Sequence, residues 1–590
     1  MKHFLVVLFC SSFLFTNAQV DPKVVTSPIY KHKKPRIYME EMLGEVDNIV
    51  YMLYSTMPVK ASTLPSLTIK MYDKEDMHLI KSKELIPDNP NLQKKYKDFT
   101  LYDYVITKKK ILFFFKDIGK KGARTIYLGT YDLNLNQKKT FTKVLSYNSR
   151  ERKFVGLANG TYPNILLTTM NYASEGEKLF IEYKELDKDF KLVKSGKVDM
   201  PFKPTFGKKK LFGSNKQAFA NRLYLSDAGQ IVTSINIEAE EVMTTKKSGK
   251  RKKDRFADAS YKSIIVIEPK NEKILEVPVK LDDRKNVGDF NWYADGNDVL
   301  VTGFYADRDL EKRGNELHGV FYMRVNVPKA KTELVKTTKF PEDFLYRINS
   351  QNTLISKRRR KKETDNESIN EVFQISKVIS NSATKEITVY CEPIHNYVVT
   401  TTDQNGNTQT TYHSDRGSLF YFKISENGEF EYFNSIRKKT KWSSGSSAIW
   451  YRESVFIHRA HDGLKDYVMF ATQRIYNERD KADLRGEKAK WKKAKRDFVI
   501  ASVSNKTGNF DLNYPQVYDK KDKKNYGTLI DNIIESNGNL YSYGIERKMR
   551  LSRIITAILT IPTIYVPYAI IVSPKSYYQK VQLNRLEIQE

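Results

Sequence analysis

Short apolar runs separated by polar turns dominate the chain, and few segments show the period of an amphipathic helix. The runs are rich in Tyr, Phe, Ile and Val, residues that favour β-strands. They come in pairs, in which we interpret the first run as an inner strand and the second, more alternating run as an outer strand. The pairs are Asn48–Tyr54 with Leu67–Tyr72, Ile111–Phe115 with Thr125–Leu133, Asn164–Tyr172 with Lys178–Leu186, Gln230–Ile237 with Ser263–Ile267, Asp298–Tyr305 with Gly319–Val325, Ile387–Tyr390 with Ser418–Ile424, Asp466–Ala471 with Asp497–Val503, and Asn539–Gly544 with Val581–Ile588.

Turn residues support this division into strands. Asp295-Gly296 and Asn427-Gly428 lie beside strand starts, where a positive φ is needed. Asn405-Gly406 lies between the runs Tyr397–Thr402 and Thr408–Tyr412, which predicts a hairpin.

The recurrence of strand pairs predicts an all-β fold, with four-stranded blades around an axis. In this layout the chain resembles secreted β-propeller repeat proteins of unassigned function, although no WD or kelch signature accompanies the repeat. The resemblance implies seven or eight four-stranded blades with long insertions over residues 46–590, preceded by an N-terminal extension at 19–45. Two or three separate β-domains are the alternative.

The first residues have the pattern of a secretory signal peptide. Lys2 precedes the apolar run Phe4–Phe15, and Thr16-Asn17-Ala18 offers small residues for cleavage after residue 18. Of the 2 cysteines, only Cys391 would remain after cleavage, so no internal disulfide is expected. We therefore expect export across the inner membrane to the periplasm, the outer membrane or the exterior.

Charge adds a candidate binding property. Aromatic residues are 12% of the chain, which excludes a disordered protein, and the net charge is +30. Basic runs fall on predicted insertions near 239–258, 356–367 and 474–496, the last with a helical segment from Arg474. The anion-binding candidates are Lys357, Arg358, Arg359, Arg360, Lys361, Lys362, Lys488, Lys490, Trp491, Lys492, Lys493, Lys495 and Arg496.

Such runs attract polyanions, so the expected partner is an envelope protein, an acidic glycan or an anionic lipid. A lysine-rich solvated surface is the alternative interpretation of the same runs. Nucleic acid is not favoured as a partner, because the sequence contains no known nucleic-acid-binding module.

Catalytic and metal-binding motifs are missing from the sequence. It contains no His-Glu-x-x-His, Cys-x-x-Cys, Gly-x-Ser-x-Gly, phosphate-binding loop or EF-hand. His458 and His461 are weak metal candidates, because only a turn between them would let both bind one ion. Cys391 is separated from His395 by Pro393, which favours a core cysteine over a nucleophile. We expect no cofactor.

The segment Ile554–Val572 is uncharged and just long enough to span a bilayer. Pro562 and Pro567 weaken a helix there, and the more basic flank precedes the segment, against the usual orientation of an anchor. We interpret it as an apolar insertion at 554–572, with membrane contact or a true span as alternatives.

The sequence therefore favours a secreted, non-enzymatic binding or scaffold protein of the cell envelope. An envelope hydrolase or lyase acting on glycan or peptide at the propeller axis is one alternative, because propeller sites are assembled from separate blades. A membrane-associated envelope protein is the other.

Overall fold

The computed structural model describes strands from Lys23 to Glu587 and, within that part, one helix. The longer ranges outside the described residues are 1–22, 57–65, 86–98, 172–179, 200–223, 352–368, 473–496, 526–533 and 550–576. The predicted signal peptide, the anion-binding candidates and the apolar segment Ile554–Val572 all lie outside the described residues.

Eight antiparallel sheets of four or more strands follow one another along the described chain. The first four contain β3 (Ile37–Val46), β4 (Ile49–Thr56), β5 (Ser66–Asp73) and β6 (Leu79–Glu84); β7 (Phe99–Ile106), β8 (Lys110–Ile118), β9 (Ala123–Asp132) and β10 (Gln137–Asn148); β11 (Arg152–Ala158), β12 (Ile165–Asn171), β13 (Phe180–Leu186) and β14 (Leu192–Asp199); and β15 (Tyr224–Leu225), β16 (Ile231–Glu238), β19 (Ser260–Glu268) and β20 (Lys273–Val279).

The remaining four sheets complete the series. They contain β21 (Arg284–Asp295), β22 (Asp298–Asp307), β23 (Gly319–Asn326) and β24 (Lys331–Lys339); β25 (Phe373–Ser380), β26 (Ile387–Thr402), β27 (Thr408–Arg416), β28 (Leu419–Ile424), β29 (Phe430–Ile436) and β30 (Thr440–Ser444); β31 (Val455–Arg459), β32 (Lys465–Thr472), β33 (Asp497–Ser504) and β34 (Phe510–Asn513); and β37 (Ile534–Ser536), β38 (Asn539–Met549) and β39 (Tyr577–Glu587) with β1 (Lys23–Thr26) and β2 (Tyr30–His32).

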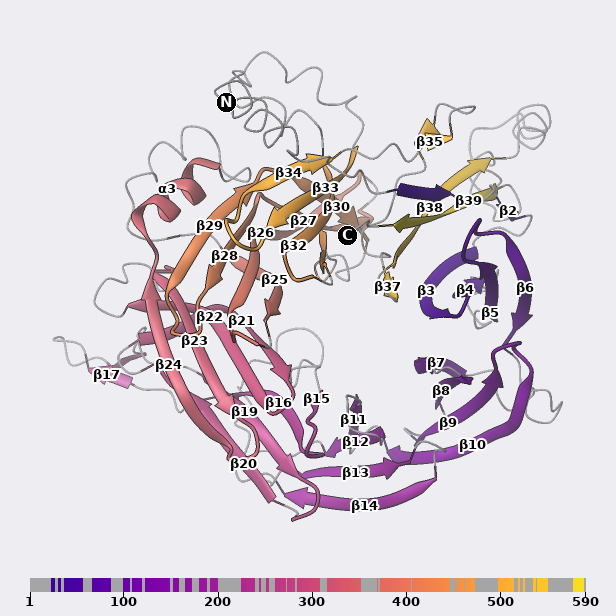
Figure 1. Cartoon of the computed structure of the whole chain (residues 1–590), viewed down its shortest axis with the longest axis horizontal. Helices are drawn as coiled ribbons and strands as arrows, with labels where there is room; N and C mark the ends of the chain where they lie inside the picture. The colour runs from indigo at the N-terminus through magenta and orange to yellow at the C-terminus, as the bar shows by residue number, and fades with distance from the viewer. Residues whose placement is uncertain are drawn as a thin grey trace, which may run out of the picture.

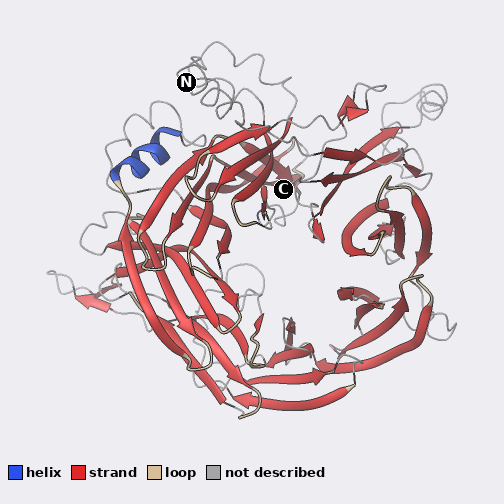
Figure 2. Ribbon diagram, in the orientation of Figure 1, coloured by secondary structure: helices blue, strands red, loops and turns tan. Residues whose placement is uncertain are grey.

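These sheets stand in a ring around a common centre, and the chain passes round it from β3 to β39 (Figure 1). Almost all of the described elements are strands (Figure 2). The protein is thus an all-β propeller, which confirms the predicted fold class, while the number of blades and the closure of the ring stay predictions. Strands β1 and β2 pair with β39, so residues from both ends of the chain share one sheet. Part of the expected extension at 19–45 therefore belongs to sheets.

The predicted strand pairs are paired strands in the structure. Asn48–Tyr54 and Leu67–Tyr72, for example, fall in β4 and β5, which are antiparallel neighbours. The interpretation of each pair as inner and outer strand was wrong, because the sheet order β3-β4-β5-β6 makes both runs middle strands. Burial on both faces explains their strong apolar signal: most of β22 is buried, whereas the outer strand β24 alternates half-buried and exposed residues.

Successive sheets pack on one another through continuous cores. One core joins the β3–β6 sheet to the β7–β10 sheet through residues such as Tyr51, Phe113 and Phe141. Another joins the β21–β24 sheet to the β25–β30 sheet through Phe304, Phe373 and others. The fold is therefore held together face to face between sheets, with no disulfide between described residues.

Tyrosine hydroxyls add polar links between neighbouring sheets. Each of five described tyrosines donates a hydrogen bond to a turn carbonyl of the next sheet. The pairs are Tyr51 with Leu133 (2.8 Å), Tyr183 with Pro269 (2.9 Å), Tyr224 with Gly296 (3.4 Å), Tyr322 with Lys385 (3.0 Å) and Tyr421 with Gly508 (2.6 Å). A tyrosine can fill the core with its ring and still satisfy a turn carbonyl at its edge.

The helix α3 (Glu342–Gln351) covers the β25–β30 sheet. Its buried Phe344 and Ile348 pack in the same core as Phe422. Arg347 donates a 2.7 Å hydrogen bond to Asn434 of β29, and Gln351 accepts one from Ser418 at 2.7 Å. The helix is therefore tied to β29 and to Ser418, the residue before β28.

Two further regions bear on the sequence predictions. The predicted insertion near 239–258 contains a small hairpin of β17 (Met243–Thr245) and β18 (Arg251–Lys253), and β35 (Tyr518–Asp519) pairs with β36 (Lys524–Asn525). No helix among the described residues is long and apolar enough to cross a membrane. Met549 and Tyr577 are direct partners in β38 and β39, so the chain leaves and re-enters the sheet at one point.

Candidate functional site

The β25–β30 sheet departs from the four-stranded pattern because β26 continues past β25 and β28, and β27 and β30 extend the sheet along this continuation. Residues Ile387–Cys391 of β26 pair with β28, and residues Ile394–Thr402 continue along β27. β30 then pairs with β27 over Tyr412–Arg416. We call the part formed by Ile394–Thr402, β27 and β30 the extended sheet.

One face of the extended sheet carries a stack of aromatic rings. Tyr397 lies opposite His413 in the register, and their rings are parallel to within 3° at 4.6 Å. The ring of His395, two residues earlier on the same face, lies 5.0 Å from Tyr397. Asp415 and Lys441 form an ion pair of 2.5 Å beside this stack. Exposed His395 and Lys441 make this face available to a partner.

Trp450 packs on the extended sheet through Tyr412. Its ring meets that of Tyr412 edge to face at 5.4 Å, and its Nε1 donates a hydrogen bond to the carbonyl of His413 at 3.0 Å. Because Tyr412 and His413 are consecutive in a strand, their side chains point to opposite faces. Trp450 therefore covers the face opposite to the aromatic stack.

A buried ionic cluster lies at the base of the extended sheet. Lys438 is fully buried, and its Nζ donates to Glu392 and, at 2.7 Å, to Ser454. Ser454 in turn donates to the Glu392 carboxylate at 2.7 Å. The fully buried Arg416 donates to Gln374 and to the carbonyl of Trp450. Burial lowers the pKa of Lys438, and the carboxylate of Glu392 opposes that change.

Ser454 and Lys438 have the composition of a serine–lysine nucleophile pair. However, Ser454 is 1% exposed and Lys438 is 0% exposed, so a substrate could not reach the hydroxyl. The cluster instead joins β26, the segment before β30 and the residue before β31. It anchors the extended sheet, because separating these groups would leave charges buried without partners.

A second buried cluster joins the β25–β30 and β31–β34 sheets. Asp466 is fully buried, accepts two hydrogen bonds from Arg459 at 2.8 and 3.1 Å, and accepts one from Tyr390 at 2.7 Å. Burial and the charge of Asp466 raise the pKa of Tyr390 well above its ordinary value. Each group is engaged by the others, so we assign this cluster to inter-sheet cohesion.

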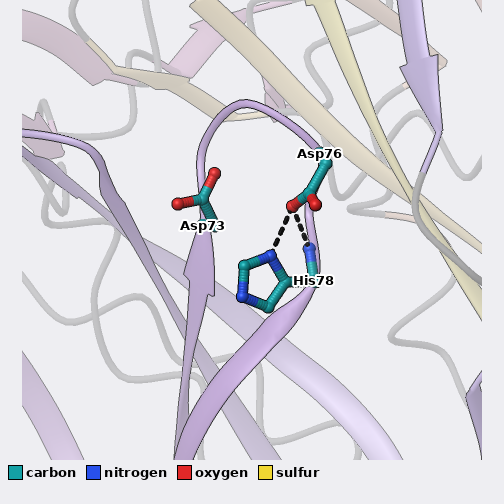
Figure 3. Close-up of side chains that lie close together, drawn as sticks. All are labelled: Asp73, Asp76 and His78. Atoms are coloured by element: carbon teal, nitrogen blue, oxygen red, sulfur yellow. Dashed lines mark hydrogen bonds and ion pairs between the residues drawn. The ribbon is translucent and has the colours of Figure 1, made fainter.

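Asp73, Asp76 and His78 form a cluster at the exposed turn between β5 and β6 (Figure 3). Their possible ligand atoms lie within 4.8 Å of one another. Asp76 already accepts hydrogen bonds from the backbone N–H of His78 at 3.0 Å and from its ring at 2.6 Å, and the backbone bond is the main cause of its lowered pKa. Asp73 accepts from Asn48 and from the N–H of Glu75. These hydrogen bonds close the turn, and we assign the cluster to that structural role.

The structure describes only some of the candidate residues that the sequence suggested. The anion-binding candidates at 357–362 and 488–496 lie outside the described residues, as does His461. His458 is buried in β31 and its ring stacks on Tyr467. Cys391 is buried in the core of the β25–β30 sheet, as the sequence favoured.

The residues of the ionic cluster were not predicted. Glu392 lies 46 positions from Lys438 and 62 from Ser454, so no local spacing joins them. The sequence pointed to this region through the strand pair Ile387–Tyr390 with Ser418–Ile424 and through the predicted hairpin of Tyr397–Thr402 and Thr408–Tyr412, but not to the cluster.

No protein-family model and no curated protein sequence matches this chain. Among solved structures, it is similar to the WD40 domain of SCAP from fission yeast, with 9% identity and a TM-score of 0.33 over 95% of this chain and 98% of that one. It is also similar to the β-propeller domain of the Trilobed protease from Pyrococcus furiosus, with 11% identity and a TM-score of 0.33 over 82% and 99%. For polysaccharide lyase Uly1 the values are 10% and 0.32 over 96% and 100%. These likenesses transfer no function to this chain.

Proposed function

We propose that this protein is a secreted, non-enzymatic scaffold of the cell envelope that binds an anionic partner. The observation that carries the proposal is the contrast between its buried and its exposed polar groups. Two described clusters, around Lys438 and around Asp466, contain side chains of the kinds found in catalytic sites. Both clusters are buried, and their polar groups are hydrogen-bonded to one another. The extended sheet, in contrast, presents an aromatic and charged face on an anchored base.

The charge of the molecule supports an anionic partner. The net charge is +30, and such a surface attracts polyanions over several ångströms beyond contact. Basic side chains on the described outer strands are spread over many sheets, as with Lys143 in β10 and Lys331 in β24. The concentrated runs at 357–362 and 488–496 are therefore the stronger candidates for contact with a partner.

Heparin, used as a model acidic glycan, tests this proposal directly. One variant changes the six basic residues of 357–362 to Gln, and a second changes Lys488, Lys490, Lys492, Lys493, Lys495 and Arg496. We expect wild-type affinity to fall steeply with salt. Neutralising six contacts should make the plot of log affinity against log salt shallower by as much as about 4, at roughly 0.7 per contact for a flexible polyanion.

The matched control removes the same charge elsewhere. It changes six exposed lysines of the outer strands and their ends to Gln: Lys143, Lys191, Lys273, Lys280, Lys331 and Lys339. This control should retain most of the wild-type slope. Equal losses in all three variants would show that only net charge matters, and a wild-type affinity indifferent to salt would contradict the proposal.

A further inference from the structure

One edge of the extended sheet has no neighbouring strand in the described part of the chain. β26 pairs with β25 only as far as Pro393, and the last backbone bond on that side runs from the N–H of Ile394 to the carbonyl of Val372 at 2.9 Å. Beyond this point, His395–Thr402 pair with β27 and with no other described strand. The open edge is therefore the side of β26 away from β27.

Strand alternation shows which backbone groups face this edge. The N–H of Ile394 points away from β27, so those of Asn396, Val398 and Thr400 do as well. The bonds from Gly417 to Pro393 (3.0 Å) and from Asp403 to Asn407 (3.0 Å) place the odd-numbered positions of β26 on the β27 side. Unpaired N–H and C=O groups at alternate residues form a template for another strand.

The side chains of this edge lack the features that usually protect a sheet edge from pairing with another strand. Ile394–Thr402 contains no charged residue and no proline, and most of its residues are β-branched or aromatic. Val398 is 44% exposed and Val399 is 40% exposed. The outer strands of other sheets carry lysines instead, such as Lys194 in β14 and Lys336 in β24, which is a common protection of sheet edges.

We propose that the edge His395–Thr402 binds an extended segment of a partner protein by adding it to the sheet as a further strand. The partner strand is neutral in the middle and acidic at its flanks, because the whole chain carries a net charge of +30. The same charge disfavours a second copy of this chain as the occupant. This inference rests on the proposed binding function and names its partner class.

Two proline variants on opposite edges of the same hairpin test the inference. Thr400→Pro removes an N–H that faces the open edge and leaves the β26–β27 bonds intact. Thr410 is its partner in the register, so Thr410→Pro removes an N–H that faces the opposite edge of the hairpin. The probe is a fluorescent synthetic peptide, Asp-Asp-Val-Thr-Val-Thr-Val-Thr-Asp-Asp, followed by anisotropy with the full-length protein.

We expect Thr400→Pro to weaken binding of the probe at least tenfold, while Thr410→Pro stays within about twofold of wild type. Two probes N-methylated on alternate residues add a test that needs no protein variant. Strand addition requires that one of the two loses binding and the other keeps it. Equal binding of both methylated probes, or equal binding by Thr400→Pro and wild type, would overturn the inference.

Light scattering distinguishes the second copy from the partner strand. A wild-type dimer that Thr400→Pro converts to a monomer would assign the edge to self-association and overturn the partner strand. Heparin affinity reports on the proposed function separately, because Thr400→Pro changes no charge. If Thr400→Pro bound the peptide as well as wild type does, while heparin binding was retained, the strand-addition inference would be rejected and the proposed function would stand.

Discussion

Lys70 shows how burial controls a single charge in this protein. It lies in β5 at 8% exposure, and its Nζ is 4.2 Å from the centre of the Tyr54 ring. Burial lowers the pKa of Lys70 to about 8. Lys438 is buried more deeply, and burial lowers its pKa too, but the carboxylate of Glu392 opposes that change. At the residue scale, burial therefore lowers the pKa of both amines, and only Lys438 has a bonded carboxylate that works against the shift.

Replacing Lys70 by Met should stabilise the protein at pH 7. The pKa of Lys70 in the folded protein, about 8, lies below the ordinary 10.5. At pH 7 the amine is protonated in both states, and burying its charge lowers the free energy of unfolding by up to roughly 3 kcal/mol. The unfolded chain holds the proton more tightly between these values, so wild-type stability should rise as pH rises from about 8 to 10.5. Thermal unfolding from pH 7 to 10.5 measures this.

The extra stability of Lys70→Met over wild type should shrink across that pH range, because the Lys70 amine of wild type becomes neutral in both the folded and the unfolded state. A matched control is Lys81→Met, on the exposed surface of β6. A constant difference between Lys70→Met and wild type at every pH would contradict the titration of Lys70.

At the scale of elements, hydrophobic pattern predicted the middle strands and missed most of the others. The middle strands are buried on both faces, so their sequence is apolar throughout. Outer strands such as β6 expose most of their residues and form through backbone hydrogen bonds to a neighbour. Helix α3 was missed although Pro341, Glu342 and Asp343 mark a helix start, because its apolar side chains cover only a short stretch.

The tyrosine links between sheets predict a specific stability effect. Tyr322 is 1% exposed, and its hydroxyl donates to the carbonyl of Lys385, a residue with a φ of 58°. Tyr322→Phe removes this buried hydrogen bond and should cost about 1 to 2 kcal/mol in the free energy of unfolding. Urea unfolding followed by tyrosine fluorescence measures the loss.

Tyr346→Phe is the control for this change, because Tyr346 lies on α3 and is 59% exposed. Its effect should stay within about 0.5 kcal/mol. If both variants lost the same stability, the link from Tyr322 to the next sheet would not contribute as described.

At the scale of the whole molecule, the sequence predicted the propeller but not its candidate site. Repetition of strand pairs favours a series of stacked sheets, because each sheet must cover the face of the next. The base of the extended sheet depends on Glu392, Lys438 and Ser454, which only the folded chain brings together. The hairpin was visible in the sequence, whereas its open edge could be recognised only once β25 was seen to end at its side.

Residue-resolved hydrogen exchange of β26 tests the central claim, that the extended sheet is an anchored element with one open edge. In the free protein, we expect slow exchange at His395, Tyr397, Val399 and Thr401, whose amides face β27, and fast exchange at Asn396, Val398 and Thr400. The fast set should become protected when the acidic-flanked Val/Thr peptide binds. Uniformly fast exchange would show that the sheet is not anchored, and uniformly slow exchange in the free protein would show that its edge is already occupied.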